Sequence, residues 1–562
     1  MATLKGPTLF FVTSPRTPSK MRPEIALLTQ AFGGKRWTAN PGLQAAFMEC
    51  LAKTPEFEGA YDPKDPAFSA RDRITRGPKA LGFVRLDRIE LTPAGTAFLD
   101  DDTAAEALLR QLLKFQLPSP FHKSNGAGGH FCVRPYLEVL RLIDVLGRLS
   151  FDELTLFGMQ LTDWHHFEAI VEAIRRFRME KEKYRGRYRQ FLGEVRTRII
   201  KEVFCREIEA GKIKTRESGK VSLDKFVKTK ASNLRDYADA CLRYLRATGL
   251  VTVSNPGRTI ALIEARRKEV AYLLATVDRN PVFVSDEKAY CQYLFDSTQP
   301  VLLTDNRAEL EAKAIACAAV QDAAEAGGLA TAELKKRIRY RHDAQRSSVV
   351  EAQVTELKTF AKYEEVLDLF QRIRARDVYD PPLAFEWNVW RTMTMLDGGE
   401  IRANLVFDDA GNPLSTAPGN AADIVCDYGS FIVTVEVTLT SGARQFEAEG
   451  ESVARHLGEI KRKTGKAAYC LVVAPTINPA LVAHCYVLHQ TDVRFYGGKA
   501  IVVPLTLAQL ISMLKQSKES GYIPSPEKIR AFCEYSRQCA TEAANEEAWH
   551  EAISQKVEAW LS

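Results

Sequence analysis

Residues 423–438 read DIVCDYGSFIVTVEVT. This stretch predicts both the type of fold and the type of site in the last third of the chain. The apolar run after Asp423 predicts a short strand, Gly429 and Ser430 predict a turn, and the β-branched run that follows predicts a second strand carrying Glu436. Folding of this hairpin would bring Asp423 beside Glu436. Two carboxylates held together repel each other unless a cation lies between them, and hard oxygen ligands suit Mg²⁺. The alternative is that each acid pairs with an Arg or a Lys.

The sequence around the hairpin alternates between strand and helix patterns. Strands are expected at about 423–427, 431–439, 468–475 and 500–505, and helices near 446–463 and 506–517. This order predicts an α/β domain with a central mixed sheet covered by helices.

Other polar residues could reach the same site. Glu436 and Thr438 lie on one face of the expected strand, because side chains alternate along a strand. Glu449 and His456 are seven positions apart in an expected helix and therefore project from one face. Glu386 lies on another expected helix beside two tryptophans. A surface acid at 449 and a structural histidine at 456 remain the alternatives.

The composition narrows the class of protein. The chain has 562 residues, which indicates about three to five domains. Apolar residues make up 46% and charged residues 26%, which is typical of folded proteins and excludes disordered, collagen-like and mucin-like chains. The sequence contains no apolar run of the length of a membrane helix, and its first 20 residues lack the features of a secretory signal. We therefore expect a cytoplasmic protein with no membrane partner.

Cysteine and histidine patterns give no metal motif. The eleven cysteines include no CxxC pair, which favours reduced thiols over disulfides or a zinc framework. The pair His165 and His166 lacks an HExxH context and is interpreted as surface or core.

Positive charge is concentrated in one segment. Residues 171–230 contain 19 Lys and Arg against 9 Asp and Glu, whereas the whole chain has a net charge of +6. Such a segment favours nucleic-acid binding, although a solvated helix face with i,i+4 ion pairs is the alternative. The candidate DNA-binding residues, interleaved with Phe177, Tyr184 and Tyr188, are Arg175, Arg176, Arg178, Lys181, Lys183, Arg185, Arg187 and Arg189.

Two segments of the first half have the order helix, strand, turn, strand. The first is 71–98, and the second is 237–263, where Asn255, Pro256 and Gly257 predict the turn. This order suggests winged-helix modules, which read DNA through a helix in the major groove. The alternative is a pair of ordinary packing units.

The segments between these modules are expected to be connecting structure. Residues 118–135 predict a loop, because they are rich in Pro, Gly and Ser. Residues 304–375 predict a helical connector, and Pro381–Pro382 are expected to stop helix formation.

The ordered set Glu386, Asp423, Glu436-Val437-Thr438, Glu449 and His456 resembles the AlwI family of type IIS restriction endonucleases, which includes site-specific nicking enzymes. The resemblance covers most of the chain and includes SPRTP at 14–18, IELTPAGTAFL at 89–99 and VVPLT at 502–506. It implies a multidomain α+β protein with a winged-helix-type DNA-recognition half, a helical connector and a nuclease domain of the PD-(D/E)XK type. The expected domains are recognition subdomains at 1–125 and 126–285, a helical linker domain at 286–380 and the nuclease domain at 381–562.

The resemblance also implies roles for single residues. Asp423 and Glu436 would bind the catalytic Mg²⁺, with the Val437 carbonyl as a possible third ligand. Glu386 would support metal or water binding, and Glu449 would complete the catalytic site from the helix together with His456.

One position departs from the wider superfamily. The lysine that usually follows the acid by two positions is Thr438 here. Either His456 or a second metal bound by Glu449 must then orient the attacking water or stabilise the charge on the phosphate. The cluster Lys461, Arg462 and Lys463 could hold the DNA backbone, or it could simply favour the helix C-terminus electrostatically.

The implied activity is Mg²⁺-dependent hydrolysis of double-stranded DNA at a fixed offset from a short asymmetric site, as a double-strand break or a nick. A double-strand break would need a transient homodimer or a second subunit, and a separate methyltransferase would protect the bacterial host. The alternatives are a non-cleaving DNA-binding regulator with a decayed nuclease domain and a nuclease of another mobile-element system.

Overall fold

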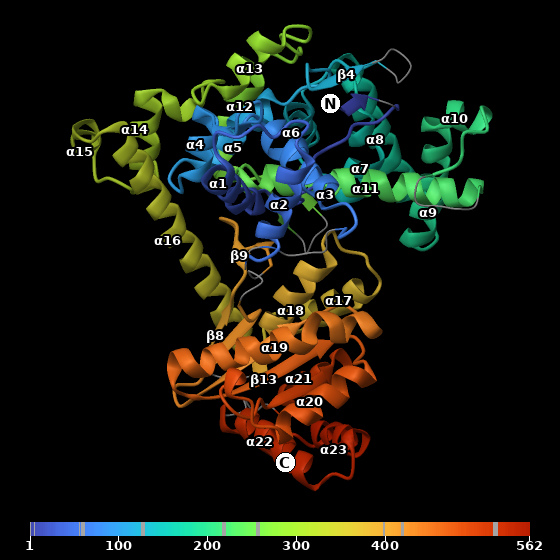
Figure 1. Cartoon of the computed structure of the whole chain (residues 1–562), viewed down its shortest axis with the longest axis vertical. Coiled ribbons are helices and arrows are strands. Elements are labelled where there is room, and N and C mark those ends of the chain that lie inside the picture. The colour runs from blue at the N-terminus through green and yellow to red at the C-terminus, as the bar shows by residue number, and fades with distance from the viewer. Residues whose placement is uncertain are drawn as a thin grey trace. The chain divides into compact units, whose positions relative to one another are not determined.

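The computed structural model describes residues 2–4, 6–54, 57, 62–124, 130–215, 221–254, 259–396, 399–416, 421–520 and 526–561. The chain divides into two compact units, Met1–Asp343 and Ala344–Ser562 (Figure 1). The division falls within helix α16 (Thr331–Lys358), inside the expected helical connector. The domain boundaries at 125, 285 and 380 stay predictions.

The first unit is mainly helical. Its helices before α16 are α1 (Met21–Phe32), α2 (Pro41–Leu51), α3 (Pro66–Ile74), α4 (Pro93–Leu99), α5 (Ala104–Lys114), α6 (Pro135–Leu146), α7 (Phe151–Leu156), α8 (Phe167–Lys183), α9 (Tyr188–Val203), α10 (Cys205–Glu209), α11 (Leu223–Ala247), α12 (Arg267–Thr276), α13 (Glu287–Phe295), α14 (Arg307–Ala316) and α15 (Ala323–Gly328). Short strands form three small sheets among them. These are β1 (Ala2–Leu4) with β4 (His122–Ser124), β2 (Val84–Arg85) with β3 (Glu90–Leu91), and β5 (Leu149–Ser150) with β7 (Thr259–Leu262) and β6 (Val251–Ser254).

Both segments expected to be winged-helix modules have the predicted element order. In the first, α3 is followed by the antiparallel pair β2 and β3 and then by α4. In the second, α11 is followed by the antiparallel pair β6 and β7, and β5 extends that sheet. The predicted turn at Asn255–Gly257 lies outside the described residues. The assignment of these units as winged helices stays a prediction.

The expectation about the two consecutive prolines was wrong. Helix α17 (Tyr363–Arg374) has already ended before them, and α18 (Pro381–Leu396) begins at Pro381. A proline in the first turn of a helix leaves no N–H unsatisfied and has a suitable φ, so Pro381 and Pro382 start a helix instead of stopping one.

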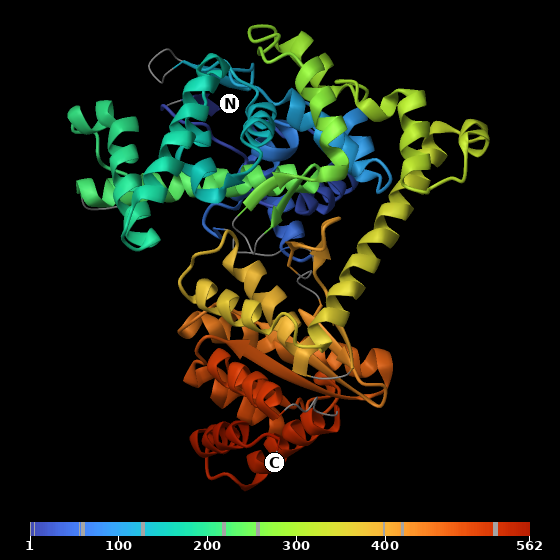
Figure 2. The ribbon, with the colours of Figure 1, turned by 180° about the vertical axis from the view of Figure 1, so that it is seen from behind.

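The second unit is built on a mixed five-stranded sheet (Figure 2). Its strand order is β14 (Val502–Thr506), β13 (Ala467–Ala474), β12 (Phe431–Val437), β11 (Ile424–Asp427) and β8 (Glu400–Ala403). Strands β12, β13 and β14 are parallel, whereas β11 is antiparallel to both β12 and β8. The four predicted strands are therefore confirmed, and β8 was not predicted. A separate pair is formed by β9 (Val406–Phe407) and β10 (Pro413–Ser415).

Helices complete the core of this unit. They are α17, α18, α19 (Ala443–Thr464), α20 (Pro479–Gln490), α21 (Leu507–Ser520), α22 (Pro526–Glu542) and α23 (Glu546–Glu558). Helix α19 packs against α20 and β13, and α18 packs against α21. Residues from all five strands and these helices form one hydrophobic core. Residues 431–436 of the central strand β12 are all buried, so Glu436 is an acid in a strand whose two faces are both covered.

The structure also bears on membrane-crossing helices and on the state of the cysteines. None of the helices in the described ranges combines the length and the apolarity needed to cross a bilayer. All eleven cysteines are free thiols.

Candidate active site

The β11–β12 hairpin places Asp423 opposite Glu436. Its register pairs Ile424 with Val435, and Asp423 and Glu436 are the next positions along the two strands. The Val437 N–H donates a hydrogen bond of 2.7 Å to Oδ2 of Asp423. The structure therefore brings together the two acids that the sequence predicted to meet.

Burial shifts the protonation equilibrium of both carboxyl groups toward the neutral form. Burial raises the pKa of Asp423 well above its usual range, and the charge of Glu436 raises it further, although the Val437 N–H opposes the rise. Burial likewise raises the pKa of Glu436 well above its usual range, and the Glu449 charge adds to this effect. Neighbouring buried acids need protons or a cation to neutralise them. Because both offer hard carboxylate oxygens, the pair fits a Mg²⁺ ion.

Helix α19 adds two polar residues to this pair. Nδ1 of His456 lies 2.9 Å from Oε1 of Glu436, and both side chains are buried. Burial raises the pKa of Glu449, and a hydrogen bond with the Thr438 side chain counteracts part of this rise. The Thr438 hydroxyl, directly after β12, also accepts a hydrogen bond of 3.1 Å from the Thr440 N–H. The predicted helix face is confirmed, because Glu449 and His456 both approach β12.

Gln445 and Gly458, which no sequence motif indicated, position α19. The amide nitrogen of Gln445 donates to the carbonyls of Thr440 and Thr476, and its amide oxygen accepts from the Asn478 N–H. Gln445 thus ties the β12–α19 loop to the β13–α20 loop. Farther along α19, a Cβ at Gly458 would come within 2.8 Å of the Tyr496 backbone. Any side chain at 458 would push α19 away from the segment around Tyr496.

Glu386 lies on α18 and is buried, with 4% of its surface exposed. The helix contacts the central strand β12. Nearby, the Trp390 indole N–H donates to the Ile401 carbonyl, which ties α18 to the edge strand β8. The part that Glu386 plays beside the carboxyl pair stays a prediction.

The basic cluster at the end of α19 is largely engaged within its own unit. Nζ of Lys461 donates to the Lys499 carbonyl at 2.6 Å, and burial lowers its pKa. The Arg462 guanidinium hydrogen-bonds the Phe495 carbonyl and lies 6.0 Å from the Phe495 ring centroid. Lys463 is exposed. Contact of Lys461, Arg462 and Lys463 with DNA stays a prediction.

The basic segment of the first unit forms the end of α8, the start of α9 and the turn between them. Seven of its eight candidate side chains are exposed, namely Arg175, Arg176, Lys181, Lys183, Arg185, Arg187 and Arg189. The eighth, Arg178, forms two hydrogen bonds of 2.8 and 3.0 Å to the buried carboxylate of Glu153. Nζ of Lys181 lies 4.7 Å from the centroid of the Tyr188 ring. Arg178 therefore has a buried partner, whereas the other seven are exposed, with Arg176 in a surface ion pair of 3.9 Å with Glu172.

Comparison with known proteins places the chain in a family. The sequence profile of the AlwI restriction endonuclease matches residues 79–513. The chain belongs to the AlwI restriction endonuclease family. Membership confirms the resemblance found in the sequence. It makes the protein a restriction-type DNA endonuclease with DNA as its partner.

Two solved structures are also similar to parts of the chain. The small subunit R.BspD6I2 of the heterodimeric restriction endonuclease R.BspD6I is 27% identical, with a TM-score of 0.30, and the match covers 35% of this chain and 98% of the subunit. The BpuJ1 endonuclease binding domain, solved in complex with pyrene- and phenanthrene-modified DNA, is 14% identical, with a TM-score of 0.33, and the match covers 49% of this chain and 91% of the domain. No curated protein matches the chain.

Proposed function

We propose that this protein is a Mg²⁺-dependent type IIS endonuclease whose second unit is a PD-(D/E)XK-type nuclease domain. It would hydrolyse DNA at a fixed offset from a short asymmetric site. The observation that carries the proposal is the facing pair of Asp423 and Glu436, which adjoins a histidine within hydrogen-bonding distance. Family membership supports DNA as the substrate.

The residues that would hold the ion are Asp423, Glu436 and the Val437 carbonyl, with Glu386 in support. When bound, Mg²⁺ would supply a positive charge that favours ionisation of a nucleophilic water and neutralises charge developing on the phosphate. Asp423 is held for this task by the Val437 N–H, which fixes one carboxylate oxygen.

We propose that His456 performs the function of the lysine that the wider superfamily has at the position of Thr438. Its Nδ1 contact fixes the carboxylate of Glu436, and its ring is close enough to the site to orient water or stabilise the phosphate charge. Thr438 stands at the position of that lysine, and Glu449, whose pKa is raised by burial, is the candidate ligand for a second ion.

The proposed function also requires recognition of the DNA site and, for a double-strand break, assembly with a second subunit. The first unit would read the site through its two winged-helix-type segments, with the exposed cations of α8 and α9 on phosphates. Lys461, Arg462 and Lys463 would contact DNA near the cut. One active site per chain cuts one strand, so a double-strand break would need a transient homodimer or a second subunit. A separate methyltransferase would protect the host DNA in a bacterial cytoplasm.

Incubation with plasmid DNA tests the proposal. The full chain with Mg²⁺ should cut the plasmid, and run-off sequencing of the products should map every end to one offset from one motif. A chelator should abolish cutting. A gel shift without any cut would instead identify a non-cleaving regulator. Ends at scattered offsets would contradict the type IIS assignment, and the ratio of nicked to linear product would show which strands are cut.

A further inference from the structure

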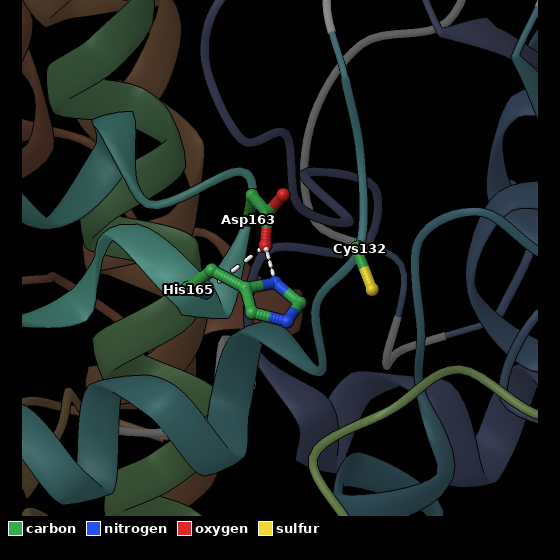
Figure 3. Close-up of side chains that lie close together, drawn as sticks. All are labelled: Cys132, Asp163 and His165. Carbon is green, nitrogen blue, oxygen red and sulfur yellow. Dashed lines mark hydrogen bonds and ion pairs between the residues drawn. The ribbon is translucent and has the colours of Figure 1, made fainter.

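Three side chains of different chemistry meet in the first unit, far from the carboxyl pair in sequence. They are Cys132, Asp163 and His165, and one candidate ligand atom from each lies within 4.8 Å of the other two (Figure 3). The close-up shows the Asp163 carboxylate directed toward the His165 ring, with the Cys132 thiol on the neighbouring segment. A thiol, an imidazole and a carboxylate are the three side-chain types that bind zinc in proteins.

The backbone holds the two segments that carry these residues side by side. Cys132 and Asp163 form an isolated parallel β-bridge. The Cys132 N–H donates to the Thr162 carbonyl at 2.9 Å, and the Cys132 carbonyl accepts from the Trp164 N–H at 3.0 Å. Main-chain hydrogen bonds therefore hold the backbones of Cys132 and Asp163 side by side, and the Cys132 thiol also lies 3.9 Å from Oδ1 of Asn280.

A second layer of contacts fixes the imidazole. The His165 ring stacks on Trp164 with its centroid 3.9 Å away and an interplanar angle of 25°. The Trp164 indole N–H donates to Oδ1 of Asn280 at 3.0 Å, and the Arg279 guanidinium lies 4.4 Å from the Trp164 ring centroid. Arg279 is in turn held by two hydrogen bonds of 2.8 and 2.6 Å to the buried Glu138. Outer contacts of this kind orient the ligands in metal sites.

The local electrostatics favour a cation. Burial raises the pKa of the Cys132 thiol, and the charge of Asp163 adds to the rise. A positive ion beside Cys132 would offset the charges of Asp163 and Asp278, which both raise the pKa of the thiol. Oδ1 of Asp163 lies 2.7 Å from Nδ1 of His165, and Oδ2 lies 3.2 Å from Nε2 of His130. Two imidazoles therefore already converge on one carboxylate.

A simpler interpretation is that Asp163 only caps the short helix that follows it. Its Oδ1 does accept from the His165 N–H at 2.9 Å. Capping explains that hydrogen bond, but it does not explain the thiol beside the carboxylate or the second imidazole on Oδ2.

We propose that Cys132, Asp163 and His165 form a zinc site. His130, whose Nε2 lies 3.2 Å from Oδ2 of Asp163, would have to move closer to the other two side chains to supply a fourth ligand. Zinc bonds of about 2.0–2.3 Å in a tetrahedron separate the ligand atoms by about 3.5 Å. The candidate ligand atoms lie within 4.8 Å of one another, so binding would need the thiol to move closer and the 2.7 Å contact between Asp163 and His165 to open. On binding, the Cys132 thiol releases its proton to solvent and coordinates as a thiolate.

The site would act as a structural clamp. Cys132 lies three residues before α6, and His165 lies two residues before α8, which carries part of the exposed basic segment. A metal joining them would fix the start of α8 against the start of α6. The inference is independent of the proposed nuclease mechanism, since none of these residues belongs to the carboxyl cluster.

Metal titration of the full chain tests this proposal. The chelator-treated protein is titrated with Co²⁺ in a large excess of Mg²⁺, which competes for hard carboxylate sites, and then with Zn²⁺ against a chromophoric chelator. The wild-type chain should show a thiolate-to-Co²⁺ charge-transfer band, bind one tight Zn²⁺ and gain thermal stability from it. Cys132→Ser should lose the band. Its Zn²⁺ affinity should fall by about 100-fold or more, because even second-layer changes cost about 10–100-fold.

Matched variants separate this site from other thiols and from the nuclease. Cys205→Ser, which removes an exposed cysteine on α10, should keep the band and the affinity. Glu436→Gln should also keep them. His165→Ala changes an exposed side chain, so it should fold normally and still lose affinity. A wild-type protein without the band, a band that survives in Cys132→Ser, or unchanged affinity in His165→Ala would overturn the zinc site.

Discussion

The carboxyl cluster of the second unit and the basic helices of the first unit hold charge in opposite ways. Asp423 and Glu436 are two acids fixed in register, of which Glu436 is buried and Asp423 is partly exposed, so each is expected to be indispensable for cutting. The cations of α8 and α9 are many and mostly exposed, so each is expected to contribute a small, additive share of DNA affinity. Cutting and binding should therefore be separable by mutation.

The largest effect is expected at the carboxyl pair. Glu436→Ala and the isosteric Glu436→Gln should lower the cutting rate by several orders of magnitude, on the order of 10³-fold or more, because the charge that holds the cation is lost. Specific DNA binding should persist in a gel-shift assay. Asp427→Asn, on the same hairpin but paired with Lys466, is the control and should cut normally. Normal cutting by Glu436→Gln would remove this residue from the mechanism.

Mutations in the basic helices α8 and α9 should instead weaken DNA binding and leave cutting intact. Replacing Arg185, Arg187 and Arg189 by Ala should weaken DNA binding without changing the cutting rate at saturating enzyme. If all three contact phosphates, the slope of log affinity against log salt should shrink by about 2.7, at about 0.9 for each contact. Fluorescence anisotropy over a salt series measures this slope. Lys515→Ala, which removes an exposed cation of α21, should leave it unchanged, and an unchanged slope in the triple variant would place DNA elsewhere.

Arg178 should behave unlike its neighbours. Arg178→Ala leaves the buried Glu153 carboxylate without its two guanidinium hydrogen bonds, so it should lower the free energy of unfolding by about 2 kcal/mol. Arg175→Ala, on the exposed face of the same helix, should change it by less than about 0.5 kcal/mol. Urea denaturation compares the two variants. Equal stability would mean that the ion pair with Glu153 contributes nothing.

The smallest expected effect is on pH dependence. The raised pKa values of Asp423 and Glu436 mean that the folded chain binds more protons than the unfolded chain above about pH 4. The free energy of unfolding contributed by this pair should therefore fall as pH rises through that range toward the folded pKa values. Glu436→Gln should flatten the dependence, and so should added Mg²⁺. Thermal denaturation at several pH values without metal measures how stability changes with pH. A pair contribution that rises with pH would contradict the prediction.

The sequence predicted the carboxyl cluster because its geometry is local. Asp423 and Glu436 are joined by one hairpin, and the two-residue period of strands fixes which side chains meet. Glu449 and His456 follow from helical spacing. The edge strand β8 was missed, and so was the bridging role of Gln445, because its partners Thr476 and Asn478 lie in a different loop.

Contacts between distant segments explain what could not be predicted. Glu153 lies 25 positions from Arg178, so nothing in the basic run indicated that this one cation has a buried partner. Cys132 and Asp163 meet through a bridge between irregular segments, which has no periodic signal in the sequence. The two prolines at 381–382 were misread, because the same residue type ends one helix and starts another.

Anomalous diffraction from crystals soaked in Mn²⁺ is the sharpest test of the proposed cation site between Asp423 and Glu436. Mn²⁺ replaces Mg²⁺ at oxygen sites and scatters anomalously, so it can be located without ambiguity. We expect an anomalous peak from an ion bound by the side chains of Asp423 and Glu436, and no such peak in Glu436→Gln crystals. Side chains that point apart at saturating Mn²⁺, with no peak between them, would contradict it.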